Sequence, residues 1–340
     1  MNGRRRLATR GAVALAAMIA AAICAGCAAA GVSRPAATAT VRAAARSAVV
    51  ARAVAPRTVS RAGARGTAAA TCNPMAASLA PLGPPTVTPG SFMAKIRARG
   101  FLIAGVDQST YHFGYLNPLD GKIEGFDIDM IKAVAQAIFG SPGHVVYKAI
   151  SDAQRIYDVQ HGIVDIVAHT MTITCARLQQ VGFSSVYFDA HQRVLVLKNS
   201  TADGLSGLGG EKVCATAGSD SATVISRYHA TSPVAEPPVL VTVPYWTDCL
   251  VKLQQYQVAA ISTDDSILDG LAAQDPFTKV VGPKLTDEPY GLALSKQHPD
   301  FVRFVNAVLA KERADGAWAH SYALWVGTSV PSPPTVGYAS

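Results

Sequence analysis

The first 70 residues contain no acidic side chain, although they hold 11 of the 30 basic residues of the chain, all of them Arg. The other 19 basic residues face all 23 acidic ones, so residues 71–340 carry about −4 while the whole chain carries +7. Because no basic stripe is left in that part, the composition argues against nucleic-acid binding. The seven arginines from Arg34 to Arg65 suit anionic lipid or wall polymer instead.

Motifs of several enzyme and cofactor classes are also missing. The sequence has no P-loop, no H-E-x-x-H and no nucleophile elbow, and its Gly207–Gly210 loop neither follows a strand directly nor opens a helix at once. No internal repeat of short fixed period is present. We therefore expect no catalytic residues, no cofactor and no metal.

The N-terminus has the pattern of an export signal over residues 1–26. Four arginines precede an apolar run from Gly11 to Ile23 that is too short to span a bilayer. Cys24-Ala-Gly-Cys27 then resembles a lipobox, with Cys24 where Leu is usual, which predicts cleavage before Cys27 and a lipid on its thiol. A redox or metal pair is the alternative, but it needs a folded frame.

Residues 27–90 are rich in Ala, Arg and Pro, without periodicity, and are predicted to be a disordered tether. From residue 91 to 327, short apolar runs alternate with helical patterns, which is typical of an α/β protein. That length gives room for two lobes rather than one core.

The segment Asp165–Arg177 is built like a ligand cradle. A short apolar strand runs into Thr170, Thr172 and Thr174, whose hydroxyls alternate along the emerging backbone. Arg177 follows with a planar fork of donors that can grip a carboxylate. The alternative is a solvated threonine turn with a surface arginine.

Thr170-Met-Thr-Ile-Thr-Cys-Ala-Arg177, followed by Gln180-Val-Gly-Phe-Ser-Ser-Val-Tyr187, resembles the "G-M-T-I-T-x-E-R … V-D-F-S-x-x-Y" signature of the polar amino-acid-binding proteins of ABC importers, solute-binding protein family 3. Gly125-Phe-Asp-Ile-Asp129 is similar to a second family motif, with Asp127 as an expected N-cap and both aspartates structural. A third is the apolar strand from Val258 that ends at Asp264 and Asp265. The glutamate/glutamine-binding lipoproteins of actinobacteria are the most similar branch.

The resemblance implies a two-lobed, type II periplasmic-binding-protein-like fold with a ligand cleft between the lobes and a two-strand hinge. The first lobe is expected over residues 91–188 and again over 290–327, and the second over 189–289. Residues 328–340 are expected to be a flexible tail.

The resemblance also implies how the α-amino-acid group is held. Arg177 and the turn Gly218-Ser219 would take the α-carboxylate, with Ser219 at the start of a helix where free N–H groups attract anions. Asp220 replaces a small residue of the family motif, so we expect it to point outward. Asp264, with the Thr170 and Thr172 region, would take the ammonium group.

Five further side chains bear on the ligand's side chain. Tyr111 and Phe113 would cover its aliphatic part, and Arg155 would hold a distal carboxylate. Asp107 favours a carboxamide instead, and His169 stands where close relatives often carry Arg. The expected order of preference is glutamate, then glutamine, then aspartate.

Four cysteines remain if Cys24 leaves with the signal and Cys27 is lipidated, and in an exported protein they suggest two disulfides with three possible pairings. Strand residue Cys214 and helix residue Cys249 are the natural pair, which leaves Cys72 for Cys175. Zinc binding by these cysteines is the alternative, but their spacings of 103, 39 and 35 residues match no zinc-finger motif.

These features together predict an exported, monomeric lipoprotein on the outer face of the cell membrane. It would close its lobes on a free amino acid and deliver it to an ABC permease. One alternative is a sensor that signals to a membrane kinase. Another is a dehydratase-type enzyme on the same fold, using Asp107, His169 and Arg177 for acid/base chemistry.

Overall fold

A computed structural model describes residues 72–231 and 236–339. The expected export signal, Cys27 and the first part of the tether lie outside the described residues. Within the described ranges, no helix has both the length and the apolar character needed to cross a membrane.

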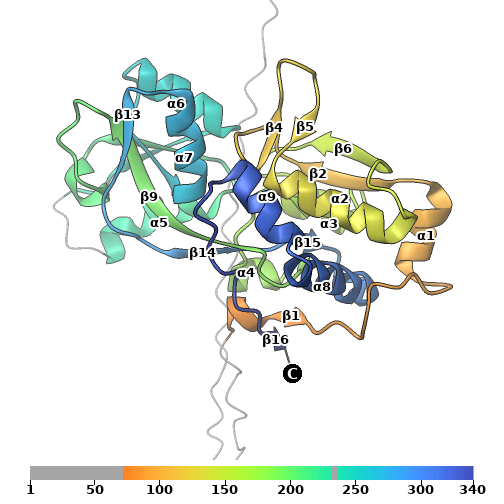
Figure 1. The fold of residues 1–340 in the computed structure, drawn as a ribbon. Coiled ribbons are helices and arrows are strands. Elements are labelled where there is room, and N and C mark those ends of the chain that lie inside the picture. Colours follow the sequence, from red (N-terminus) through yellow and green to blue (C-terminus); the bar gives the residue numbers. More distant parts are fainter. Residues whose placement is uncertain (1–71, 232–235, 340) are drawn as a thin grey trace, which may run out of the picture. The chain divides into compact units, whose positions relative to one another are not determined.

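The first lobe contains a five-stranded sheet (Figure 1). In sheet order its strands are β6 (Val145–Ala149), β2 (Leu102–Val106), β7 (Ile166–Ala168), β15 (Ala293–Leu294) and β8 (Gly182–Phe183). Strand β2 runs parallel to β6 and to β7, and these parallel neighbours are connected through α2 (Phe126–Phe139) and α3 (Arg155–Gln160). The carboxyl ends of β2 and β7 therefore meet at one edge, beside the second lobe.

The remaining elements of the first lobe cover and extend this sheet. They are α1 (Phe92–Arg99), the small sheet of β3 (Ser109–Thr110), β4 (Gly114–Leu116) and β5 (Ile123–Glu124), then α4 (Cys175–Leu178), α8 (Pro299–Ala314) and α9 (Ala317–Trp325). Trp318 is buried and donates its indole N–H to the Tyr187 carbonyl at 2.8 Å. Trp318 is therefore part of the first-lobe core, and Tyr322 and Trp325 pack against that core.

The second lobe contains a six-stranded sheet. Its strands are β11 (Val239–Val243), β10 (Lys212–Thr216), β12 (Ala260–Asp264), β9 (Phe188–Leu197) and β13 (Thr278–Val281), with β14 (Asp287–Tyr290) also paired to β9. Its helical elements are η2 (Leu205–Leu208), α5 (Asp220–Thr231), α6 (Trp246–Gln254) and α7 (Asp265–Gln274). Strand β10 is parallel to β11 and β12, so Thr216 and Asp264 end their strands on the same side.

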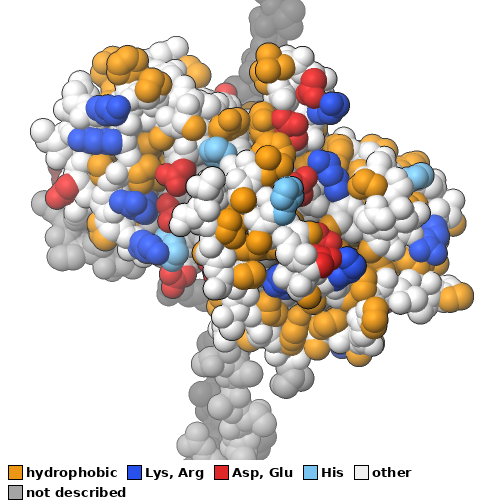
Figure 2. All heavy atoms as spheres, viewed as in Figure 1, with side chains coloured by type: hydrophobic (Ala, Val, Ile, Leu, Met, Phe, Trp, Pro, Cys, Tyr) orange, Lys and Arg blue, Asp and Glu red, His pale blue; other side chains and the backbone are white. Residues whose placement is uncertain are grey.

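Two antiparallel strands connect the lobes, because β9 leads into the second lobe and β14 leads back. At this connection His191 Nδ1 lies 3.4 Å from Asp265 Oδ2, and His191 Nε2 lies 3.5 Å from Asp287 Oδ1. Figure 2 shows acidic side chains and a histidine together where the lobes meet on the viewed face. The architecture is the two-lobed α/β fold with a two-strand hinge that the sequence predicts.

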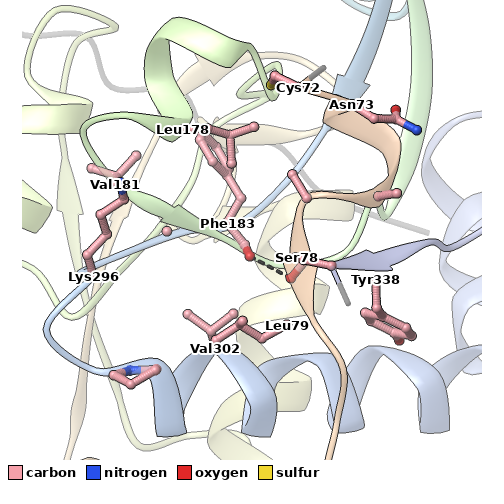
Figure 3. Close-up of a pocket in the computed structure, with 15 residues that line it drawn as sticks. Cys72, Asn73, Ser78, Leu79, Leu178, Val181, Phe183, Lys296, Val302 and Tyr338 are labelled. Atoms are coloured by element: carbon pink, nitrogen blue, oxygen red, sulfur yellow. Dashed lines mark hydrogen bonds between the residues drawn. The ribbon is translucent and has the colours of Figure 1, made fainter. Parts of the chain in front are cut away.

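The end of the expected tether is packed on the first lobe rather than disordered. It contains η1 (Pro74–Ala76) and β1 (Ser78–Leu79), and Ser78 donates its hydroxyl to the Phe183 carbonyl at 2.7 Å (Figure 3). Strand β16 (Tyr338–Ala339) pairs with β1, so the expected flexible tail also ends in an ordered strand. A cavity of about 710 Å³ lies beside this segment and is lined by residues of β1, β8 and β16.

The described residues contain two disulfides, and they are the pairs expected from the sequence. Cys72 and Cys175 have Cα atoms 6.0 Å apart and join the docked segment to α4. Cys214 and Cys249 have Cα atoms 5.6 Å apart and join β10 to α6 inside the second lobe.

Candidate ligand-binding site

A buried polar cavity lies between the two lobes, at the carboxyl ends of β7, β10 and β12. Its lining combines side chains of both lobes: Asp152, Arg155, Thr170, Thr172, Arg177, Ser219, Asp220, Ser221, Trp246, Thr263, Asp264 and Ile267. The free volume is about 10 Å³, which is roughly the room of one water molecule. The lobes are thus closed on each other, and any larger ligand enters only when they separate.

Two arginines form the cationic side of the cavity. Arg177 donates to the Thr172 carbonyl at 2.8 Å and to the Gly218 carbonyl at 3.2 Å, and Arg155 donates to the same Gly218 oxygen at 3.3 Å. Both guanidinium groups are buried. Burial, and then the charge of Arg155, lower the pKa of Arg177 to about 10, so it stays protonated at neutral pH. This part of the cavity strongly favours an anion.

The turn before α5 closes over these arginines. Gly218 has a φ of 87°, and a Cβ atom there would lie 2.7 Å from the Ala153 Cα of the first lobe. Ser219 caps the helix by accepting a hydrogen bond from the Ala222 N–H at 3.1 Å. Asp220 lines the cavity, so the prediction that it points outward is wrong. The negative charge of Asp220 acts to raise the pKa of Arg177.

Acidic groups lie at or beside the same cavity. Asp264 ends β12, is 4% exposed and accepts a hydrogen bond from the Tyr290 hydroxyl at 2.6 Å. Burial and then the charge of Glu288 raise the pKa of Asp264 well above its ordinary value. Glu288 accepts from the Thr172 hydroxyl at 2.7 Å, and burial raises its pKa as well. A cation placed here would relieve the repulsion between these carboxylates.

Asp152 is a further acidic residue of the cavity. Its carboxylate lies 2.6 Å from Arg155 Nη1 and accepts a hydrogen bond from the Thr216 hydroxyl of the second lobe. Burial acts to raise its pKa, but Arg155, His169 and Thr216 together hold that pKa below its ordinary value. Sequence reasoning missed Asp152, although its position three residues before Arg155 on one turn was a signal for an ion pair.

A buried cation pair and buried carboxylates at one cavity can hold a ligand that carries both charges. Residues 102–328 match the profile of the bacterial extracellular solute-binding proteins, family 3. The chain belongs to this family. Its members are solute-binding proteins of transport systems and not enzymes, and they act outside the cytoplasm.

Individual family members are similar over most of their length. The ABC transporter glutamine-binding protein GlnH of Bacillus subtilis is 35% identical over 235 residues, covering 69% of this chain and 84% of GlnH. The glutamate-binding protein GluB of Corynebacterium glutamicum is 29% identical over 241 residues, covering 67% and 78%. Among solved structures, an ancestral arginine-binding protein bound to glutamine aligns with a TM-score of 0.60 at 32% identity, covering 67% and 99%. The fold is that of the type II periplasmic binding proteins.

Six of the ligand-binding residues expected from the sequence line the cavity: Arg155, Thr170, Thr172, Arg177, Ser219 and Asp264. Gly218 joins them through its carbonyl oxygen. Four other expected positions are not at the wall, and each has a local role instead: Asp107, Tyr111, Phe113 and His169.

Asp107 is committed to the turn after β2. Its carboxylate accepts hydrogen bonds from the backbone N–H groups of Gln108 and Ser109 at 2.6 and 2.8 Å, and from the Thr110 hydroxyl at 2.5 Å. Phe113 is fully buried in the first-lobe core, where its ring meets Phe188 edge-on at 5.0 Å.

Tyr111 is 36% exposed and packs against the rings of His112 and Tyr115. His169 is buried behind the cavity, with Nε2 3.0 Å from the Ile150 carbonyl. Neither side chain lines the cavity of the closed lobes.

Asp127 holds the backbone of the cradle rather than capping a helix. Helix α2 begins one residue earlier, at Phe126, and has Gly125 at its N-cap, so the expected capping role of Asp127 is wrong. Its carboxylate instead accepts from the Thr170 N–H at 2.8 Å and from the Tyr187 hydroxyl at 2.6 Å. Burial raises the pKa of Asp127 to about 6. These bonds support Thr170, whose φ of 40° is unusual for a β-branched residue.

Proposed function

We propose that this protein captures a free amino acid with a side-chain carboxylate or carboxamide, glutamate or glutamine ahead of aspartate, and delivers it to the permease of an ABC importer. The observation that carries the proposal is that Arg177 of the first lobe and Asp264 of the second line one buried cavity. A zwitterion places its carboxylate and its ammonium group a few ångströms apart, so one molecule satisfies both sides. Relatives that bind glutamine and glutamate support this ligand class.

The α-carboxylate would bind Arg177 and the N–H groups at the start of α5, and the ammonium group would bind Asp264. In the closed structure the Gly218 carbonyl takes hydrogen bonds from Arg177 and Arg155. A bound carboxylate would replace that carbonyl as the acceptor. Burying each charge beside a partner is the condition for burying it without a large desolvation cost.

The charge at Arg155 decides between glutamate and glutamine. Asp152 already neutralises Arg155 at 2.6 Å, so the site does not require a second carboxylate there. A carboxamide oxygen can accept from the same guanidinium without adding charge. We therefore place glutamine beside glutamate, and aspartate after both because its shorter side chain reaches less far.

Isothermal titration calorimetry on the full chain, freed of carried-over ligand by unfolding and refolding with its disulfides intact, tests the proposal. The ligands are glutamate, glutamine, aspartate, asparagine and arginine, and the variants are Arg177→Gln and Arg155→Gln. We expect Arg177→Gln to weaken every ligand at least about 100-fold, because it leaves a buried carboxylate unpaired. Arg155→Gln should weaken glutamate more than glutamine.

Arg193→Gln is the matched control, since Arg193 donates to the Gly282 carbonyl and does not line the cavity. It should leave all affinities unchanged. A wild-type chain that binds none of the five ligands would contradict the proposed function.

We also propose that the chain is anchored by a lipid on Cys27 after removal of residues 1–26. The arginines before a short apolar run and the Cys24-Ala-Gly-Cys27 sequence support this proposal. Metabolic labelling with a fatty-acid analogue should mark the wild-type protein and not Cys27→Ala. Equal labelling of both would exclude Cys27 as the anchor.

A further inference from the structure

Trp246 differs from the other tryptophans of the chain in the state of its indole N–H. The Trp318 N–H donates to the Tyr187 carbonyl at 2.8 Å, and the Trp325 N–H donates to Asp129 Oδ2 at 2.7 Å. The Trp246 side chain is buried, with 2% of its surface exposed, yet its N–H has no hydrogen-bond partner in the described part of the chain. This unpaired tryptophan is the one that lines the ligand cavity.

A buried donor without a partner destabilises the protein, and native structures rarely keep one without a reason. A second such atom lies in the same cavity wall on the opposite lobe. The hydroxyl of Thr170 is buried and has no partner among the described residues. Each lobe thus contributes to the cavity lining one residue that has an unpaired buried polar atom.

The position of Trp246 indicates which part of the ligand would meet it. The charged ends of an amino acid already have partners, at Arg177 with the start of α5 and at Asp264 with Glu288. Trp246 begins helix α6, which carries none of these partners and packs against β3 of the first lobe. The ligand's side chain is the part left to contact it.

We infer that the Trp246 indole N–H donates a hydrogen bond to the side-chain oxygen of the bound amino acid, with the Thr170 hydroxyl as a second partner from the facing lobe. This inference rests on the proposed amino-acid binding. An indole N–H donates and cannot accept, so it recognises carboxylate and carboxamide oxygens alike. It gives no partner to the cationic end of arginine or to an aliphatic side chain, and therefore acts as a specificity residue for the side-chain oxygen.

Calorimetry with two ligands separates this role from a structural one. Glutamine has a side-chain oxygen, whereas norvaline has an unbranched aliphatic chain without one. In the full chain, Trp246→Phe keeps an aromatic ring and removes the N–H. We expect glutamine affinity to fall about 10-fold or more and norvaline affinity to change less than about 3-fold. Equal losses for both ligands would overturn the inference.

Trp325→Phe is the control, because it removes an indole N–H that is paired with Asp129 away from the cavity. It should leave the ratio of glutamine to norvaline affinity unchanged. If it changes that ratio as Trp246→Phe does, the effect is not specific to the cavity and the inference fails.

An NMR measurement on the wild-type full chain needs no variant to fold well. Selective nitrogen-15 labelling of the three tryptophans gives indole N–H signals, and the Trp246 signal should move downfield when glutamine is added. Glutamine binding without movement of that signal overturns the inference and leaves the proposed function intact. Failure of the wild-type chain to bind any amino acid overturns both.

Discussion

At the scale of single residues, the proposed site assigns the ligand's ammonium group to the buried carboxyl group of Asp264. The charged groups that act on it within its lobe and the hinge are other carboxylates, first Glu288 and then Asp265 and Asp220. With burial, they raise its pKa well above the ordinary value. A ligand ammonium group would reverse this effect, because an adjacent positive charge favours the ionised form.

We therefore predict that ligand binding releases a proton from Asp264 at pH values between its raised free pKa and its lower bound pKa. Within that window affinity rises with pH, by up to about tenfold per unit for one proton released. Calorimetry in buffers of different ionisation enthalpy counts the released proton directly.

Asp264→Asn is the control for this linkage, since it cannot release the proton. It should bind more weakly and lose most of the dependence on pH. An unchanged proton count in Asp264→Asn would assign the titration to another group.

At the scale of elements, the turn into α5 depends on the absence of a side chain at position 218. Gly218 has a φ of 87°, and an added Cβ would lie 2.7 Å from Ala153 Cα across the lobes. We predict that Gly218→Ala lowers ligand affinity at least about 10-fold, because the lobes no longer close fully, and lowers stability by about 1 kcal/mol through backbone strain. Calorimetry and thermal unfolding measure the two effects.

Gly140→Ala separates strain from closure. Gly140 also has a positive φ, 77°, but a Cβ there meets nothing within 4 Å. It should lose similar stability and keep its ligand affinity. Loss of affinity in both variants would show that strain alone explains the effect at Gly218.

The attachment of residues 72–90 to the first lobe depends on a disulfide that closes a long loop. Cys72 and Cys175 are 103 residues apart in sequence. We predict that the double variant Cys72→Ser, Cys175→Ser loses about 2–4 kcal/mol of stability, since the link restricts the unfolded chain. Limited proteolysis should then cut within residues 72–90, while glutamine affinity stays within about 3-fold because the cavity does not include this segment. Protection equal to that of the wild type would show that the noncovalent contacts of Ser78 hold the segment alone.

At the scale of the whole molecule, the proposed function requires movement between the lobes. The closed cavity has about 10 Å³ of free space, so an amino acid enters only after separation. The Thr216 hydroxyl of the second lobe bonds to Asp152 of the first, and Gly218 bonds to both arginines. These contacts stabilise closure, and a ligand adds its own contacts to both lobes.

We predict that Thr216→Val shifts the unliganded protein toward the open form and weakens ligand binding about 3- to 10-fold, because one hydrogen bond between the lobes is lost. Small-angle X-ray scattering should report a larger radius of gyration without ligand. Thr278→Val is the control, since Thr278 donates to the Asp275 carbonyl within the second lobe. An identical effect of the two variants would argue against Thr216 as a contact for closure.

The sequence by itself determined the α/β class and pointed to Arg177 and Asp264, two of the charged residues that line the cavity. A short strand or the start of a helix lies at Arg177, at Asp264 and at the Gly218-Ser219 turn. Such local patterns can be recognised from the amino-acid sequence. The pair Cys214 and Cys249 also followed from its place on a strand and a neighbouring helix, and Cys72 and Cys175 were the cysteines left over.

Only the tertiary structure decided which side chains face one another. Glu288 and Trp246 come from elements far from the cradle in sequence. No local pattern indicates that Glu288 bonds to Thr172, or that Trp246 lines the same cavity as Thr170. Phe113 was expected in the cleft, but it lies in the core, because an aromatic side chain after a strand can pack to either side. Spacing along a chain fixes local conformation, whereas contacts between lobes depend on how the two sheets are joined through β9 and β14.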